Sequence, residues 1–169
     1  MAHFPAAPWP KALKVSSGVA TVLLAGVEFA ATKTIPLYGL AHLVGTLVAW
    51  LPPALLAGAG LFAVMGYDLD ASTLRVRRLL WSTVIPLEGL TRVWHDPQAI
   101  RHSIKIFGNG GMFAFTGLYR SKTLGRYRLF ATDPASAVVL QLAGRTLVIT
   151  PSSPHAFVQL MSRALPGAR

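Results

Sequence analysis

Residues 37–65 read LYGLAHLVGTLVAWLPPALLAGAGLFAVM and contain no Asp, Glu, Lys or Arg. A helix needs about 20 predominantly apolar residues to cross a bilayer, and this stretch is longer than that. Residues 15–32, VSSGVATVLLAGVEFAAT, are also apolar apart from small hydroxyl residues and Glu28. This shorter stretch reaches spanning length because Lys33 can extend its ammonium to the interface. We therefore predict a membrane hairpin of two spans, over residues 15–35 and 43–65.

The first apolar segment allows two other interpretations. A secretory signal would begin with charges, here Lys11 and Lys14, but residues 30–32 form a poor cleavage site and a second apolar segment follows at once. We therefore expect both segments to be retained. Glu28 is a functional candidate because carboxylates are rare inside membrane spans. We interpret it instead as a residue near the outer end of the span, close to Lys33 and headgroup water.

The chain is strongly basic, with 16 Lys+Arg against 6 Asp+Glu and a net charge of +10. Such a balance indicates binding to nucleic acid or to an anionic membrane surface, and the membrane is the simpler interpretation for a chain with spans. Lys11 and Lys14 precede the hairpin, and Arg75, Arg77 and Arg78 follow it, whereas the turn between the spans has only Lys33. The positive-inside rule then predicts a multi-pass protein of the cell inner (plasma) membrane with both termini in the cytoplasm.

From Gly66 onward the apolar pattern changes to the alternation of strands that have one wet and one buried face. Residues 137–142 and 145–150 flank a two-residue turn, which predicts a hairpin. After Pro154 the apolar residues have helical spacing, and the buried side is expected to hold Phe157, Leu160, Met161 and Leu165. We therefore predict a two-helix transmembrane hairpin followed by an α+β, mainly β domain. This domain should have six or seven strands in a bent sheet or barrel and one C-terminal helix.

The predicted organisation has four parts. They are a cytoplasmic N-terminal tail over 1–14, the transmembrane hairpin over 15–65, the β-rich domain over 66–166 and a tail over 167–169. Roughly 100 residues are enough for an independent core, so we expect the β-rich domain to fold by itself.

Short segments of the β-rich half occur in a recognisable order and spacing. They are Gly66-Tyr67, Leu74 to Arg78, Ile85-Pro86-Leu87, Phe107 to Gly111, Thr116 to Tyr119, Leu124 to Arg128, Phe130 to Asp133, the hairpin over 138–150 and the helix start Ser153 to Phe157. Together they resemble the bacterial pleckstrin-homology-like (bacterial PH) domain proteins, over residues 67–166 and with a membrane hairpin in front. The resemblance implies a seven-stranded bent sheet capped by a helix. It implies no chemistry, because a fold alone does not assign a function.

The sequence contains no motif that indicates catalysis, a metal or a cofactor. The Gly-rich stretch at 107–111 lacks the Lys-Ser/Thr of a P-loop and the spacing of a dinucleotide-binding loop. We interpret Gly108, Gly110 and Gly111 as a structural turn with positive φ angles. The five histidines show no metal-ligand spacing, and cysteines are absent. We therefore expect no enzyme activity, no metal and no cofactor.

The candidate binding feature is a basic cluster around a polar turn, which alternates with two tyrosines. It consists of Arg120, Lys122, Arg126 and Arg128. Arginine suits phosphate and carboxylate groups, so the cluster is a candidate contact for an anionic surface, and the alternative is a solvated rim. Nucleic acid is not an expected partner, since it needs a larger basic face with stacking aromatics.

Two functional hypotheses follow. The first is a non-catalytic, membrane-anchored module that mediates protein interaction or assembly at the cytoplasmic face of the membrane, with an unknown protein partner or by self-association. The alternative is sensing of anionic lipid headgroups or of a small ligand by the β domain. Binding of the isolated domain to anionic lipid would separate the two.

Overall fold

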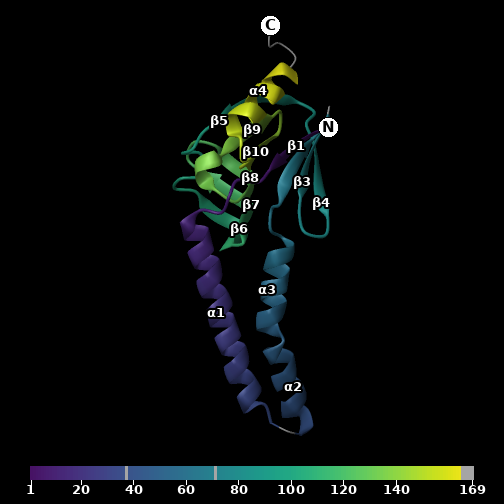
Figure 1. Cartoon of the computed structure of the whole chain (residues 1–169), viewed down its shortest axis with the longest axis vertical. Helices are drawn as coiled ribbons and strands as arrows, with labels where there is room; N and C mark the ends of the chain where they lie inside the picture. The colour runs from purple at the N-terminus through teal and green to yellow at the C-terminus, as the bar shows by residue number, and fades with distance from the viewer. Residues whose placement is uncertain (37, 71, 165–169) are drawn as a thin grey trace.

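The computed structural model describes residues 1–36, 38–70 and 72–164. Its helical part is a pair of long apolar rods that project from one end of a β-rich domain (Figure 1). The first rod is α1 (Lys11–Thr34), and the second consists of α2 (Gly39–Ala49) and α3 (Leu51–Leu61). Each rod begins four residues before the predicted span. Pro10, extended at φ −66° and ψ 159°, immediately precedes α1, and Gly39, at φ 77°, is the first residue of α2.

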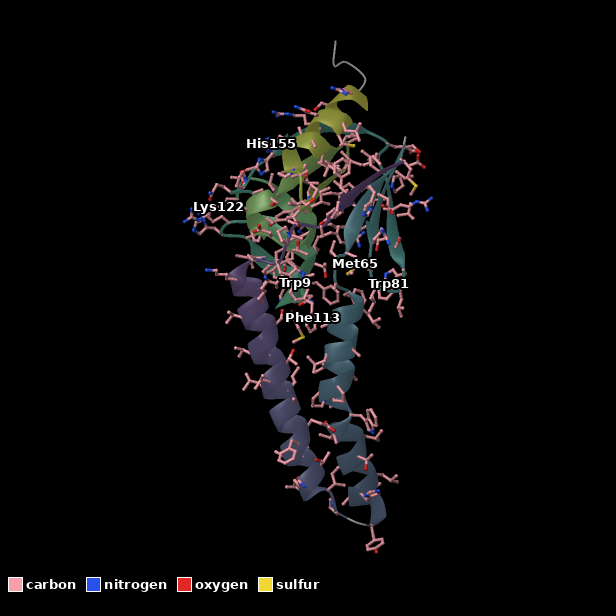
Figure 2. All side chains as sticks on the ribbon, viewed as in Figure 1. Trp9, Met65, Trp81, Phe113, Lys122 and His155 are labelled. Atoms are coloured by element: carbon pink, nitrogen blue, oxygen red, sulfur yellow. The ribbon has the colours of Figure 1, made fainter. Side chains whose placement is uncertain are left out.

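The second rod bends where α2 meets α3. Pro52 and Pro53 have no N–H to donate, so two helical hydrogen bonds are lost there. The helix nevertheless resumes at once, because Trp50 N–H donates to the Thr46 carbonyl and Ala54 N–H donates to the Trp50 carbonyl. Figure 2 shows side chains of both rods projecting outward along the part that extends beyond the β-rich domain.

The β-rich domain is built from two sheets. The first has the order β1-β2-β3-β4 and is antiparallel throughout, with strands β1 (Ala2–Pro5), β2 (Gly66–Leu69), β3 (Thr73–Arg77) and β4 (Ser82–Pro86). The second has the order β5-β9-β10-β8-β7-β6. Its strands are β5 (Leu90–His95), β6 (Ile104–Met112), β7 (Ala114–Ser121), β8 (Gly125–Ala131), β9 (Val138–Leu142) and β10 (Arg145–Ile149). Only the β8–β10 pair is parallel among the described strands.

The fold class predicted from sequence is confirmed, although the described residues form ten strands where six or seven were predicted. One of the additional strands comes from the N-terminus. Residues 2–5, predicted to be part of a tail, form β1 and pair with β2 in the register Ala2↔Leu69 to Pro5↔Gly66. The prediction of a simple tail over 1–14 is therefore corrected. The free edge of β2 takes up the N-terminal residues, and the helix pair becomes an insertion between two neighbouring strands.

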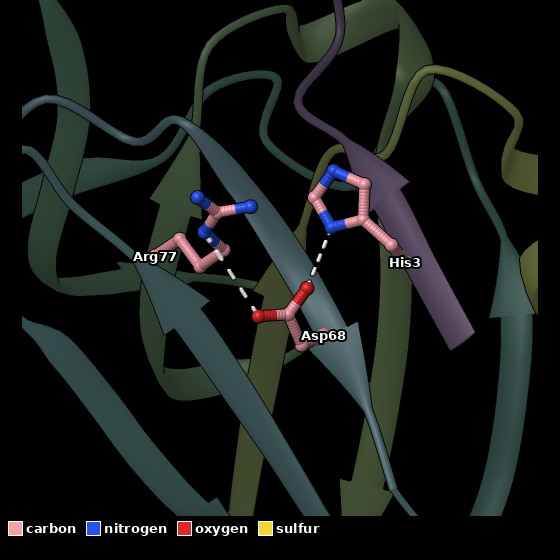
Figure 3. A network of polar contacts seen from close by, with 3 residues as sticks. All are labelled: His3, Asp68 and Arg77. Carbon is pink, nitrogen blue, oxygen red and sulfur yellow. Dashed lines mark hydrogen bonds and ion pairs between the residues drawn. The ribbon is translucent and has the colours of Figure 1, made fainter. Parts of the chain in front are cut away.

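Polar and aromatic contacts hold β1 in place. His3 Nδ1 lies 2.6 Å from the Asp68 carboxylate, which also lies 3.9 Å from Arg77 Nε (Figure 3). On the other side of the strand, the Phe4 ring packs edge-on against Phe157, with 5.0 Å between centroids. The first sheet and the C-terminal helix are thus joined through the N-terminal residues.

A short 3-10 helix, η1 (Pro134–Ser136), precedes β9, and α4 (Pro154–Ala164) closes the core at the end remote from the rods (Figure 1). Phe157 and Met161 are buried against the sheets, as their spacing predicted. Leu160 is 37% exposed, so its predicted burial is wrong, because it faces the solvent side of α4. Leu165 lies outside the described residues.

Candidate functional site

A cavity of about 880 Å³ lies where the helix pair meets the second sheet. The α1 side contributes Ala20, Leu23 and Leu24, and the α3 side contributes Ala54, Leu55, Gly58, Ala59 and the following Phe62. The sheet side contributes Phe107, Gly108, Asn109, Met112, Thr116, Gly117, Leu118, Arg128 and Phe130, together with Arg78 after β3. Its size falls in the usual range of ligand pockets, roughly 300–1,000 Å³.

The cavity exists because the two rods diverge toward the domain (Figure 1). Small residues of α3 face this space: a Cβ added to Gly58 would meet no atom within 4 Å. The small residues Gly58 and Ala59 of the second rod therefore line an open volume. The helical wall is entirely apolar.

In the sheet wall of the cavity, β6 and β7 approach each other closely at two paired glycines, Gly108 and Gly117. Gly108 has φ 118° and Gly117 has φ 139°, a region that favours glycine. A Cβ on Gly108 would lie 2.2 Å from the Thr116 carbonyl oxygen, and one on Gly117 would lie 2.1 Å from the Phe107 carbonyl oxygen. Gly108, Gly110 and Gly111 thus lie within β6, which corrects the interpretation of this segment as a turn. Positive φ occurs at Gly108 and Gly111 but not at Gly110.

Hydrogen bonds fasten the start of α1 beside this wall. Ser16 Oγ donates to the Gly111 carbonyl at 2.9 Å, and Phe113 N–H donates to Ser17 Oγ at 2.9 Å. The Trp9 and Phe113 rings pack with 5.9 Å between centroids. The small hydroxyl residues of the first apolar segment therefore position the sheet over the cavity.

Two arginines provide the only positive charge on the cavity wall. Arg78 Nη1 donates to the Phe62 carbonyl at 2.8 Å and Nε to Thr83 Oγ1 at 3.3 Å. The Arg78 Cζ atom lies 5.1, 5.9 and 5.5 Å from the centroids of the Phe62, Trp81 and Phe130 rings. Arg128 Cζ lies 5.6 Å from the same Phe130 ring. We call this group, Phe62, Arg78, Trp81, Arg128 and Phe130, the arginine–aromatic cluster.

The cluster carries uncompensated charge. Burial lowers the pKa of Arg78 from its ordinary value, and the neighbouring Arg128 charge lowers it further. No carboxylate lines the cavity, and neither arginine has an ion pair in the part of the chain that the structure describes. Two neighbouring guanidiniums without carboxylate partners, next to apolar walls, favour an anionic ligand. Such a ligand would accept hydrogen bonds from their N–H groups and balance their charge.

The sequence-predicted basic cluster is divided by the structure. Arg120 lies directly opposite Arg126 in the β7–β8 pairing, and Arg128, two residues farther along, shares their face. Of these residues only Arg128 reaches the cavity wall. Figure 2 shows Lys122 at the tip of the turn, on the outer side of the domain and away from the helices.

Sequence reasoning used Arg78 only as a flanking charge and missed its partnership with Arg128. No local signal could have joined them, because they lie fifty positions apart, Arg78 directly after β3 of the first sheet and Arg128 on β8 of the second. Their meeting depends on how the second sheet sits over the end of α3.

The domain surface next to the helices is also apolar. The β3–β4 turn exposes Leu79 (59%), Leu80 (74%) and Trp81 (39%), and β6 exposes Ile104 (73%) and Phe107 (78%). Trp81 lies beside the upper end of α3 (Figure 2). This apolar belt therefore continues the exposed apolar surface of the rods.

The histidines and carboxylates do not assemble into a metal centre. No group of three or more potential ligands occurs among the described residues. His95 and His155 pack edge to face with 4.8 Å between centroids, and His95 Nε2 lies 3.2 Å from the Ala135 carbonyl oxygen. This pair closes the contact between β5 and α4.

Glu28 lies on α1, part-buried, and one of its carboxylate oxygens is buried without a hydrogen-bond partner among the described atoms. Lys33 is engaged elsewhere, with Nζ 5.2 Å from the Phe29 ring centroid. No ion pair between Glu28 and Lys33 occurs among the described residues, and the expected place of Glu28 near headgroup water stays a prediction.

Comparison with known proteins identifies the β-rich part. No curated protein and no solved structure matches the chain. The family model for the bacterial PH domain matches residues 65–165, which is more than half of the chain. Two helices in front of it, Lys11–Thr34 and Gly39–Leu61, are long and apolar enough to cross a membrane. The chain is thus a member of the bacterial PH domain family.

Proposed function

We propose that this protein is a membrane-anchored, non-catalytic PH-like module that makes its interactions at the cytoplasmic surface of the inner membrane. The observation that carries the proposal is the exposure of the helix pair. Only 6% of the apolar window of Lys11–Thr34 and 11% of that of Gly39–Leu61 is buried within the chain. Apolar surface of this extent needs a cover, and a bilayer provides it for both helices at once.

The apolar belt supports a domain seated directly on the bilayer. The exposed Trp81 lies beside the upper end of α3, where its ring packs on Phe62 (Figure 2), and the exposed Phe107 lines the cavity together with α1 and α3. Tryptophan is enriched at membrane interfaces, where an apolar ring and a polar N–H are both satisfied. The domain is therefore held close to the headgroups by its own surface as well as by the helices.

The basic residues that flank the helices support one orientation of the chain in the membrane. Arg75, Arg77 and Arg78 follow the second helix, and Lys11 and Lys14 open the first, whereas the far turn is preceded only by Lys33. The positive-inside rule assigns the domain and both termini to the cytoplasm.

A protein partner is supported by the free edge of the first sheet. Strand β4 has a neighbour on one side only, and Val84 on it is 52% exposed. Such an edge offers backbone N–H and C=O groups to an added strand of a partner or of a second copy. The family is generally non-catalytic, which agrees with a binding role.

The absence of cysteine makes the anchorage directly testable, because every introduced thiol reports without background. Single variants Tyr38→Cys, Val22→Cys and Ser153→Cys would be expressed in bacterial cells and exposed to a membrane-impermeant maleimide. We expect Tyr38→Cys to react in intact cells, Ser153→Cys only after permeabilisation, and Val22→Cys in neither state. Release of the chain by alkaline carbonate, or reaction of Ser153→Cys in intact cells, would refute anchorage or orientation respectively.

The interaction edge calls for a separate test. A photo-crosslinking residue at Val84 on β4 would be compared with one at Gln141, which is exposed on β9 between two neighbouring strands. A discrete adduct at Val84 and none at Gln141 is the expected result. Equal labelling at both positions would exclude β4 as a specific edge.

A further inference from the structure

We infer that the cavity between the helices and the second sheet binds one anionic phospholipid, with its phosphate at Arg78 and Arg128 and its acyl chains against α1 and α3. This inference rests on the proposed membrane anchorage. It assigns a bounded site to a single lipid molecule, in place of a diffuse attraction between the Arg120–Arg128 turn and the membrane surface.

The helical wall suits acyl chains. Leu23, Leu24 and Leu55 face the cavity, and Gly58 and Ala59 leave room between them. These residues belong to the same helices that would lie in the bilayer. A lipid can therefore enter sideways from the surrounding leaflet without leaving an apolar environment.

The opposite end of the cavity suits a phosphate. Two N–H groups of Arg78 are used by Phe62 and Thr83, and no other hydrogen bond to Arg78 or Arg128 occurs within the described residues. A guanidinium has five N–H donors, so both arginines retain donors for phosphate oxygens. The Phe130 ring, contacted by both guanidiniums, restricts their positions before a ligand binds.

The charge of the site selects among possible occupants. An apolar helix of another protein would fill the walls but leave the part-buried Arg78, and Arg128 beside it, without an anion. A zwitterionic lipid would bring its own cation beside them. An anionic headgroup joined to acyl chains satisfies both ends, and membranes supply such molecules at high local concentration.

The test uses the full-length chain, purified in a mild detergent and equilibrated with equal amounts of phosphatidylglycerol and phosphatidylcholine. Native mass spectrometry would count each lipid retained per chain. We expect one retained phosphatidylglycerol in clear preference to phosphatidylcholine. The double variant Arg78→Gln/Arg128→Gln should lower that preference by about tenfold or more, equivalent to about 1.4 kcal/mol.

Matched controls separate the site from general basicity and from misfolding. Arg75→Gln/Arg126→Gln removes two exposed arginines that do not line the cavity and should leave the preference unchanged. Gly58→Leu projects a side chain into open space within the cavity and should reduce retention of both lipids. Gly26→Leu makes the same change in α1, at a position with open space outside the cavity wall, and should have no effect.

Three outcomes would overturn the inference. The first is retention of both lipids in the proportion supplied. The second is an equal loss in the control arginine pair, which would show a nonspecific charge effect. The third is unchanged lipid retention in Gly58→Leu together with altered self-association, which would assign the cavity to a second copy of the chain. Failure of lipid selectivity in a chain that still resists carbonate extraction would leave the proposed anchorage standing.

Discussion

Tyr67 is the best position at which to test the structure quantitatively. Its side chain is fully buried, and its hydroxyl donates to the Phe130 carbonyl at 2.6 Å and accepts from Thr150 N–H at 3.1 Å. The substitution Tyr67→Phe keeps the ring but leaves these two buried backbone groups without this partner. Each unsatisfied group costs about 1–3 kcal/mol, so two of them predict a loss of roughly 2–6 kcal/mol in the free energy of unfolding.

The assay is thermal melting of the full-length chain in detergent micelles, followed by circular dichroism of the strands. For a domain of this size 1 kcal/mol corresponds to about 4–8 °C, so the variant should melt roughly 10 °C or more below the parent at pH 8. Tyr38→Phe changes an 84% exposed tyrosine and is the matched control. A shift within about 2 °C for Tyr67→Phe would refute the bridging role of the hydroxyl.

The same residue predicts an alkaline signature. Burial raises the pKa of Tyr67 to about 12, against the ordinary 10.0, and the hydrogen bonds with Thr150 and the charge of Arg78 only partly oppose this. A pKa raised in the folded state stabilises the protein below pH 10, and this stabilisation is lost as the pH rises toward 12. The difference in the free energy of unfolding between the parent and Tyr67→Phe should therefore decrease between about pH 10 and pH 12. Burial also raises the pKa of Tyr119 and Tyr127, so both proteins should retain some alkaline loss.

Three further substitutions test other parts of the fold. Gly117→Ala should destabilise the domain by about 1–3 kcal/mol through backbone strain and contact with β6, whereas Gly144→Ala, which meets open space, should be neutral in the same melting assay. Phe157→Ala should cost about 3–5 kcal/mol because the ring is fully buried, and an unchanged melting temperature would show that α4 does not close the core. Asp68→Asn should leave the melting temperature within a few degrees but speed amide hydrogen exchange in residues 2–4, since it removes the carboxylate charge beside His3 and Arg77. Unaltered exchange there would mean that backbone pairing alone holds β1.

The parts of the fold that were predicted correctly are those with a local signal. Residues 37–65 indicate a long apolar helix by composition, and the structure has α2 and α3 there. The alternation on either side of residues 143–144 predicts a hairpin, and β9 and β10 pair across that turn. Both features depend on neighbours within a few residues, so the sequence contains the necessary information.

The parts that were missed depend on distant partners. Residues 2–5 are too few to show a period, and their partner strand begins at Gly66, beyond both helices. Glycines at 108–111 are typical of loops, but they form a strand because Gly108 and Gly117 must pass without side chains between them. The site was missed for the same reason: Arg78 and Arg128 meet only after two sheets and a helix end have assembled.

The insertion of the helix pair between β1 and β2 gives the domain two attachments to its anchor. Pro5 and Gly66 are register partners, Ala7 N–H donates to the Thr150 carbonyl at 2.8 Å, and each strand leads within a few residues into one helix. On the proposed anchorage, helices tilt to match the thickness of the bilayer, and their separation at the surface changes with the tilt. A single tether would absorb this motion by swivelling. Two connections to adjacent strands pass the change in helix separation on to the domain. A thinner or thicker membrane would therefore strain the pairing of β1 with β2 and change the width of the cavity between the helices and the second sheet.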